Sequence, residues 1–376
     1  KIALNYDLHQ VAFMLAEELQ YYMALYQHNL SESEKYDQIA KQQLDCTRIE
    51  NKVKTYYSKH VVSLNYSRNM PDEFLIELDQ NCTEFENDLN YNSASINVFL
   101  YIIFIARHYA FYDYAKVVKV CYEANSFFKS SQYPNRRYNF FYRVVPALLA
   151  LNRYDEARDN ITMAIELSTR GTANWSLCNY YHLVLCFHEQ KYQEAYHFYQ
   201  AVKKDNKTMY RSLGEAWLIL KAYLSFFYKT GHIESEQQEY FKLSKFLNEL
   251  PIASQDKAGN NINIMIVQIL HMVVNRKGKL IDAVEAFEKY VRRYLKSKNL
   301  FRAKIFITML LRIPRYRFHK AAVLRHSSKL HQQLVGTPSR MGQNLEIEIV
   351  PYEVLWEVVL ELLERKFARS RPKVKT

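Results

Sequence analysis

A four-residue bend motif recurs along the chain about every 40 residues and constrains the fold more than any other feature. Its copies are Tyr112–Ala115, Tyr154–Ala157, Tyr192–Ala195 and Leu280–Ala283. The alanines that end them are 42, 38 and 88 residues apart, and the longest interval predicts a degenerate copy near Gly231. Self-similarity at a period of about 40 residues is typical of stacked helical repeats.

Each repeat has the pattern of a helical hairpin. An aromatic-rich helix comes first, a polar bend follows, and an amphipathic helix such as EARDNITMAIEL (156–167) closes the unit. The alanine after each bend falls where two antiparallel helices approach closely, so a large side chain there would separate them. The chain has only 7 Gly and 8 Pro, which favours helix and argues against an all-β or doubly wound α/β protein. We therefore predict an all-α solenoid of antiparallel hairpins.

The pattern from Leu148 or Leu149 through Ala157, followed by Ala164 and Ile165, resembles the tetratricopeptide repeat (TPR). The resemblance covers 96–300 and implies a right-handed α-solenoid whose first helices line a concave groove. Most of the family's Trp and Gly signature is absent, and the units are longer than its repeat of about 34 residues. The chain is also similar to uncharacterised bacterial TPR-type proteins, which brings no assigned activity and implies a longer N-terminus. The segments that carry this likeness are 211–227, 241–270, 301–323 and 346–364.

The regions on either side of 96–300 have a different character. Residues 1–95 are acidic and predict N-terminal helices of the solenoid, with apolar positions at Leu8, Val11, Leu15 and Leu19. Residues 301–376 predict basic helices, then a short strand at LEIEIV (345–350), whose apolar and acidic residues alternate. A capping helix follows Pro351, and a disordered basic tail begins at about residue 369.

Charge divides the chain. Its net charge is +12, although residues 1–100 contain 8 Lys/Arg against 15 Asp/Glu, whereas residues 276–340 contain 17 Lys/Arg against 3 acids. The basic segment predicts either a surface for an anionic partner such as nucleic acid or a solvated face around a buried apolar stripe. The candidate residues of this basic face are Lys289, Arg292, Arg293, Lys296, Arg312, Arg315, Arg317, Lys320 and Arg325.

A second set of candidates follows from aligning the units on their bend alanines. Polar positions of the first helices would then face the groove, where Tyr and Arg suit recognition of a protein or peptide. Packing between helices is the alternative role for any single tyrosine. These groove candidates are Arg107, Asn139, Tyr142, Arg143, Tyr180, Lys221, Lys229, Gln268 and Arg276.

The sequence contains no motif for catalysis, for a cofactor or for a metal. There is no P-loop, G-x-G-x-x-G, G-x-S-x-G or H-E-x-x-H. We expect no metal site, because His182 and His188 are six residues apart and His319, His326 and His331 are seven and five apart, whereas ligation from one helix needs spacings of three or four.

The five cysteines are odd in number and include no C-x-x-C pair, which argues against a disulfide framework and predicts a reducing, cytoplasmic setting. Cys178 and Cys186 are eight residues apart on one predicted helix face, and we interpret them as core residues. The longest apolar run, 96–112, is interrupted by Arg107 and His108 and predicts a buried helix, so we expect no membrane span.

These observations predict a non-enzymatic scaffold or adaptor that binds a protein or peptide partner in its groove. One alternative is a helical-repeat protein that binds nucleic acid through 276–340. Another is a TPR-type regulator that changes curvature when it senses a ligand or peptide. The acidic N-terminal third also offers a partner for the basic face of a second copy, so a homodimer stays open.

Overall fold

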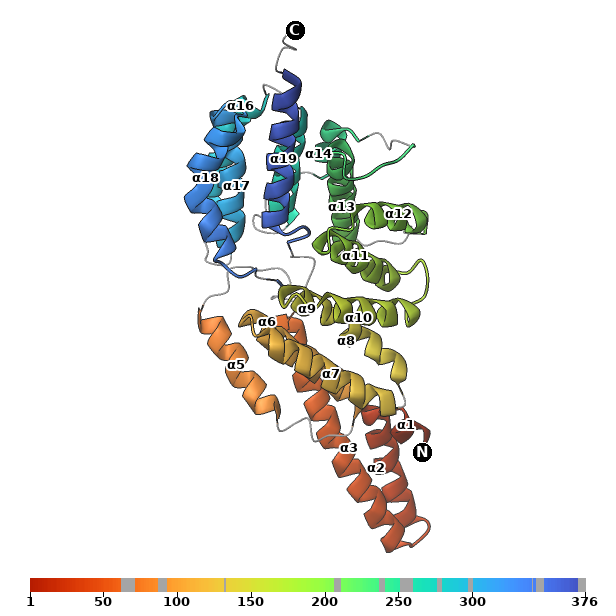
Figure 1. Cartoon of the computed structure of the whole chain (residues 1–376). Coiled ribbons are helices and arrows are strands. Elements are labelled where there is room, and N and C mark those ends of the chain that lie inside the picture. Colours follow the sequence, from red (N-terminus) through yellow and green to blue (C-terminus); the bar gives the residue numbers. More distant parts are fainter. Residues whose placement is uncertain are drawn as a thin grey trace, which may run out of the picture. The chain divides into compact units, whose positions relative to one another are not determined.

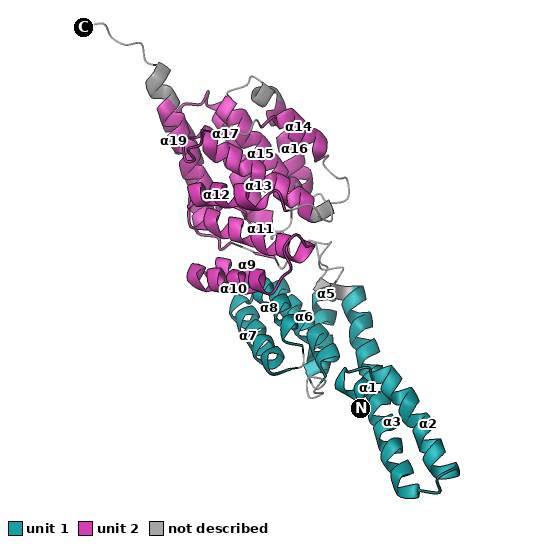
Figure 2. Ribbon diagram, turned by 90° about the vertical axis from the view of Figure 1, so that its right-hand side faces the viewer, with its two compact units in different colours: residues 1–144 teal, residues 145–376 magenta. Residues whose placement is uncertain are grey.

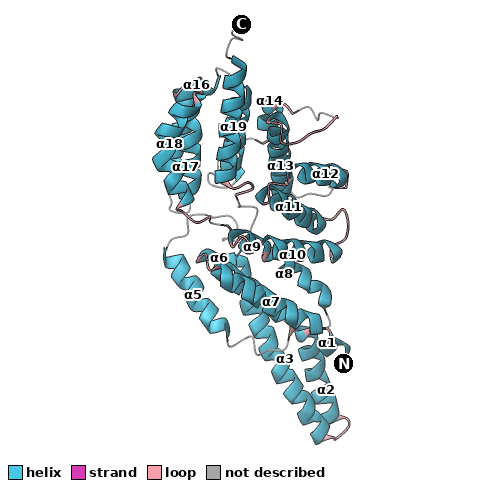
Figure 3. Ribbon diagram, in the orientation of Figure 1, coloured by secondary structure: helices cyan, strands magenta, loops and turns pink. Residues whose placement is uncertain are grey.

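The computed structural model describes residues 1–61, 72–86, 93–131, 133–205, 211–236, 241–250, 260–275, 279–296, 300–339, 341–342 and 348–370. Every regular element within these ranges is helical, and none of them is a strand (Figures 1 and 3). The prediction of an all-α chain is therefore confirmed. The predicted strand at 345–350 is not seen in its described part, because residues 348–350 form coil and a bend, and 345–347 lie outside the described residues.

The chain forms two compact units, residues 1–144 and 145–376, a boundary that the sequence did not predict (Figure 2). In unit 1 the apolar run at 96–112 becomes a helix with ten buried residues, as predicted. The helices of unit 1 are α1 (Ile2–Asn5), α2 (His9–Leu25), α3 (Leu30–Tyr56), η1 (Tyr57–Val61), α5 (Asp72–Glu86), α6 (Ala94–Ala110), α7 (Tyr114–Ser130), η3 (Pro134–Arg137) and α8 (Tyr138–Arg143).

Unit 2 contains helical hairpins of its own and ends in a long helix. Its helices are α9 (Val145–Ala150), α10 (Tyr154–Glu166), α11 (Ala173–His188), α12 (Tyr192–Val202), α13 (Arg211–Lys229), α14 (Leu243–Glu249), α15 (Asn260–Asn275), α16 (Lys279–Tyr294), α17 (Phe301–Arg315), α18 (Lys320–Val335) and α19 (Tyr352–Ser370). Residues 371–376, most of the predicted disordered tail, lie outside the described residues.

The recurring bend is a specific helix-ending turn. In the copies that the structure describes, a residue with positive φ follows the first helix, and the next backbone N–H donates to a carbonyl five residues earlier, as in a Schellman motif. The turn before Leu280 lies outside the described residues. Lys191 N–H, for example, donates to Cys186 O at 2.8 Å. The left-handed residues of these turns are Tyr112, Asn152, Gln190, Gly231 and Arg317. The first four are 40, 38 and 41 residues apart, and Gly231 occupies the predicted degenerate copy.

The same turn fixes which residue of the second helix is buried. The fourth residue after the N-cap has no exposed surface in four of the second helices, where it is Val117, Ala157, Ala195 or Val323. The sequence alignment on Ala115 was therefore wrong by two positions, because Ala115 is exposed and Val117 takes the buried place. A small or β-branched side chain suits this position because the paired helices approach closely there.

Neighbouring hairpins of unit 2 contact each other through equivalent residues. Tyr154 packs edge-on against His188 of α11, and Tyr192 stacks on Phe227 of α13 with ring centroids 3.8 Å apart. The first residue of a second helix therefore covers the next hairpin rather than only its own open end. Contacts of this kind between successive hairpins hold a repeat array together.

The repeat breaks after Gly231. Residues 232–236 form no second helix, and α13 instead packs against α15. The C-terminal helix α19 contacts this turn, because Arg365 donates to Thr230 O at 2.8 Å and Glu361 lies 3.5 Å from His232. Helix α19 also packs on α18. It therefore bridges two parts of unit 2, whereas the sequence predicted a helix that only caps its end.

Glu348, just before α19, is buried and contacts two other helices of unit 2. Its carboxylate pairs with Arg302 of α17 at 2.6 Å, and its carbonyl accepts a hydrogen bond from His188 Nε2 of α11 at 2.8 Å. Arg302 also donates to Leu334 O at the end of α18 and pairs with Glu353 of α19 at 2.8 Å. Loss of Arg302 would leave the buried Glu348 carboxylate without its ionic partner, which is strongly destabilising. The network therefore joins α11, α17, α18 and α19.

We expect Ala195→Leu to lower the free energy of unfolding by about 1–3 kcal/mol, because the larger side chain overpacks the closest approach within a hairpin. The matched control is Ala115→Leu, which places the same side chain on an exposed position of α7 and should change stability by less than about 0.5 kcal/mol. Urea unfolding measures both. Equal destabilisation by the two substitutions would contradict the buried register.

We expect the free energy of unfolding to fall as the pH drops from about 6.5 to about 4. Burial lowers the pKa of His188 and of His271 to about 4, whereas an unfolded histidine binds its proton near pH 6.5. Between these pH values the unfolded chain binds protons that the folded chain does not bind. Each histidine therefore lowers the free energy of unfolding by at most about 1.4 kcal/mol per pH unit. Urea unfolding between pH 7 and 4.5 should show a shallower slope in His188→Gln, and an unchanged slope would contradict this assignment.

Candidate functional site

The most prominent surface feature is an apolar stripe on α2. Its residues recur at spacings of three and four, which places them on one helix face. The members of this α2 stripe, each between 38% and 73% exposed, are Leu8, Val11, Leu15, Leu19, Tyr22 and Tyr26. Met14 and Leu25 add exposed apolar surface beside it. A contiguous exposed apolar patch of this kind marks an interaction surface.

A neighbouring face of α2, roughly a quarter turn around the helix axis from the stripe, is the one that packs against α3. His9, Ala12 and Ala16 are buried there, and His9 Nδ1 lies 2.8 Å from Gln43 Oε1 of α3. The other ring nitrogen lies 2.8 Å from the Ser93 hydroxyl, which caps α6. The predicted apolar positions of this region therefore lie on the outer face of α2, and small residues and one histidine form its inner face.

One acidic side chain borders the α2 stripe. Glu18 is exposed and lies three residues after Leu15 and four before Tyr22, whereas the exposed Glu17 is two residues from Leu15 and from Leu19 and lies on another face. The lysines nearby are paired within their own helix, since Lys35 contacts Glu32 and Lys41 lies 2.6 Å from Asp37. The surroundings of the stripe therefore favour basic groups on whatever covers it.

Most groove candidates are engaged within their own unit. In unit 1, Arg107 pairs with Asp79 and Glu86, the Asn139 amide donates to Arg136 O, and the guanidinium of Arg143 lies over the ring of Tyr142. The remaining candidates belong to unit 2 or lie outside the described residues.

In unit 2, Tyr180 has no exposed surface, and Lys229 lies 3.3 Å from His271 Nδ1 and over the ring of Phe241. Lys221 and Gln268 are partly exposed, and Arg276 lies outside the described residues. A fully buried Tyr180 has a core role, so the prediction that it faces a groove was wrong.

The basic candidates lie on or beside α16, α17 and α18, which pack in sequence. Two are ion-paired, since Arg315 lies 2.6 Å from Glu288 and Lys320 lies 2.6 Å from Glu364. Arg312 donates to His326 O, and Arg293 lies over the ring of Tyr294. The other basic candidates are exposed: Lys289, Arg292, Lys296, Arg317 and Arg325. The predicted apolar stripe beneath them is buried except at Leu324, which is 40% exposed.

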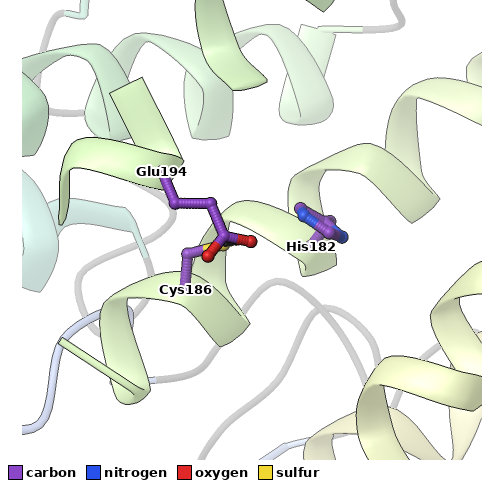
Figure 4. Close-up of side chains that lie close together, drawn as sticks. All are labelled: His182, Cys186 and Glu194. Carbon is purple, nitrogen blue, oxygen red and sulfur yellow. Dashed lines mark hydrogen bonds between the residues drawn. The ribbon is translucent and has the colours of Figure 1, made fainter. Parts of the chain in front are cut away.

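Three side chains of metal-ligating type meet at the end of the α11–α12 hairpin. His182 and Cys186 project from one face of α11, and Glu194 projects toward them from the first turn of α12 (Figure 4). Their ligand atoms all lie within 4.8 Å of one another, and Cys186 Sγ is 4.0 Å from Glu194 Oε1. Arg158 of α10 approaches from outside, 3.6 Å from Glu194 Oε1.

Two of the three side chains in this cluster are uncharged at neutral pH. Burial, reinforced by the nearby Glu194, raises the pKa of Cys186 to about 12, so the group is a thiol. Burial lowers the pKa of His182, which leaves the imidazole neutral. The histidine therefore presents an unprotonated nitrogen, whereas the sulfur must lose a proton before it binds a cation.

The sequence prediction missed this cluster because it considered the spacing between two histidines or between two cysteines, and not the spacing between a histidine and a cysteine. The available signal was the spacing of four between His182 and Cys186, the interval that it required of two ligands on one helix. Glu194 needed the hairpin geometry, because it lies across the turn. The predicted burial of Cys178 and Cys186 is confirmed, and Cys46, Cys82 and Cys121 are buried free thiols as well.

No family model, curated protein or solved structure matches the chain. Among the described residues, no helix has the combined length and apolarity that a membrane span requires. The candidate functions therefore depend on the α2 stripe, the basic face and the His182–Cys186–Glu194 cluster themselves.

Proposed function

We propose that the protein is a non-enzymatic scaffold that binds an amphipathic helix of a partner protein on the α2 stripe. The observation that carries this proposal is the exposure of six regularly spaced apolar side chains along one helix face. An amphipathic helix recognises such a surface by inserting its own apolar residues at matching spacings of three and four. The TPR-like architecture implied by the sequence is part of the proposal, and its five free thiols fit a reducing compartment such as the cytoplasm.

The charge around the stripe selects the partner. Glu18 borders it near its midpoint, so a partner helix with Lys or Arg beside its apolar residues gains attraction. A second copy of α2 packed antiparallel on the stripe would bring this glutamate close to its own symmetry mate. Because like charges at such a contact are costly, a basic-flanked partner helix is favoured over a homodimer.

The other predicted functions have less support from the structure. The groove candidates are largely engaged in internal contacts, which moves the proposed interaction surface from the groove to α2. Nucleic-acid binding through 276–340 remains a prediction from charge, with Arg315 and Lys320 of its face paired to acidic residues. A ligand-sensing regulator remains a prediction from the TPR resemblance.

We expect the full chain to bind a synthetic amphipathic helix with a leucine stripe flanked by lysines at least tenfold more tightly than the same peptide flanked by glutamates. Attraction to Glu18 is the physical reason, so added salt should reduce the difference. Fluorescence anisotropy of the labelled peptides measures both affinities.

The variant for this test is Leu15→Glu with Tyr22→Glu, which should abolish binding of both peptides. Its matched control is Leu324→Glu, which places the same charge on an exposed apolar residue of α18 and should leave binding unchanged. Equal affinity for the two peptides would contradict the proposed partner. So would a wild-type chain that sediments as a dimer and becomes monomeric in the double variant.

A further inference from the structure

We propose that His182, Cys186 and Glu194 form a binding site for one divalent transition-metal ion, with zinc the ion that suits these donors best. The site lies in unit 2 and uses no residue of the α2 stripe. It is therefore independent of the proposed scaffold function.

The backbone fixes the three donors before any ion binds. His182 and Cys186 are one turn apart on α11, so both side chains leave the same face of the helix. The closing turn of the hairpin is anchored on Cys186 itself, whose carbonyl accepts the Lys191 N–H at 2.8 Å. Helix α12 starts directly after that turn, and its third residue, Glu194, then faces the α11 pair (Figure 4).

The donor set is one that zinc favours. It combines an imidazole nitrogen, a sulfur and a carboxylate oxygen, all of which are established zinc ligands. Tetrahedral zinc with these bond lengths places its ligand atoms about 3.5 Å apart. The observed spread of up to 4.8 Å therefore needs only small side-chain rotations. Because the Glu194 side chain is 48% exposed, water can take the fourth position, which leaves an open coordination site.

Residues around the cluster orient the donors. The ring of His182 stacks on Phe198, one turn beyond Glu194 on α12, with centroids 4.1 Å apart. This contact holds the imidazole plane against the second helix of the same hairpin. Arg158 lies on the outer side of Glu194 and also pairs with Glu189, so it can keep its ion pair with Glu189 when Glu194 turns toward an ion.

Charge and atoms balance when the ion binds. The S–H bond of Cys186 breaks, the sulfur–metal bond forms, and the proton passes to solvent without any change in oxidation state. The resulting thiolate and the Glu194 carboxylate together carry two negative charges, which match a divalent cation. Neutral His182 adds a third bond without adding charge.

The test uses the full untagged chain, stripped of metal with a chelator and titrated with Co²⁺ as a spectroscopic substitute for zinc. We expect one Co²⁺ per chain, with a near-ultraviolet thiolate-to-cobalt charge-transfer band and the intense visible bands of tetrahedral cobalt. Addition of Zn²⁺ should bleach both. Absence of the charge-transfer band in the wild type would overturn the proposal.

Variants assign the site. Cys186→Ser should remove the charge-transfer band, and His182→Gln and Glu194→Gln should each weaken Co²⁺ binding at least tenfold. Because Glu194 is half-exposed, its variant keeps the test valid even where Cys186→Ser does not fold, as circular dichroism will show. The matched control is Cys178→Ser, a buried thiol two turns earlier on α11, which should bind as the wild type does. A band that survives Cys186→Ser, or that disappears in Cys178→Ser, would contradict the assignment.

Discussion

The left-handed turn that ends each first helix is the constraint on which the rest of the structure depends. A residue with positive φ at Tyr112, Asn152, Gln190 or Gly231 reverses the chain, and the following N–H bonds back to the helix it leaves. The second helix must then start at a fixed place, which puts its fourth residue at the closest approach of the pair. Non-glycine residues accept the left-handed conformation at a cost of about 1–3 kcal/mol, which the buried contact that follows offsets.

Packing between hairpins decides which side chains are covered and which come together. Within unit 2, Tyr154 and Tyr192 each contact the next hairpin, so successive hairpins cover one another. On α2 the face with Ala12 and Ala16 is buried, and the apolar stripe on the neighbouring face is exposed. The α11–α12 turn, in turn, brings Glu194 beside His182 and Cys186. The metal-type cluster thus arises from the way one hairpin closes, whereas the apolar stripe is the surface that α2 leaves exposed when it packs on α3.

The sequence predicted the parts of this fold that depend on local pattern. Helical content, the period near 40 residues, the copy at Gly231 and the buried helix at 96–112 all followed from residue spacing. The register at Val117 could not be predicted in this way. The motif at Tyr112–Ala115 matches the other repeat copies in sequence, but it lies two residues before the equivalent structural positions. The network of Arg302, Glu348 and His188 also escaped prediction, since 114 residues separate His188 from Arg302. Periodicity identified the stripe at Leu8 and Leu15 but could not show which side of α2 is buried.

The most direct test of the proposed interaction surface is the reactivity of cysteines introduced on the two faces of α2. The five native thiols are buried, so a maleimide should report mainly on the new residue in the folded full chain. Leu15 is 54% exposed and Ala16 is 3% exposed. We expect Leu15→Cys to react at the rate of a free thiol at all protein concentrations, and Ala16→Cys to react at least tenfold more slowly. Protection of Leu15→Cys, or equal rates at the two positions, would contradict an exposed apolar face on α2.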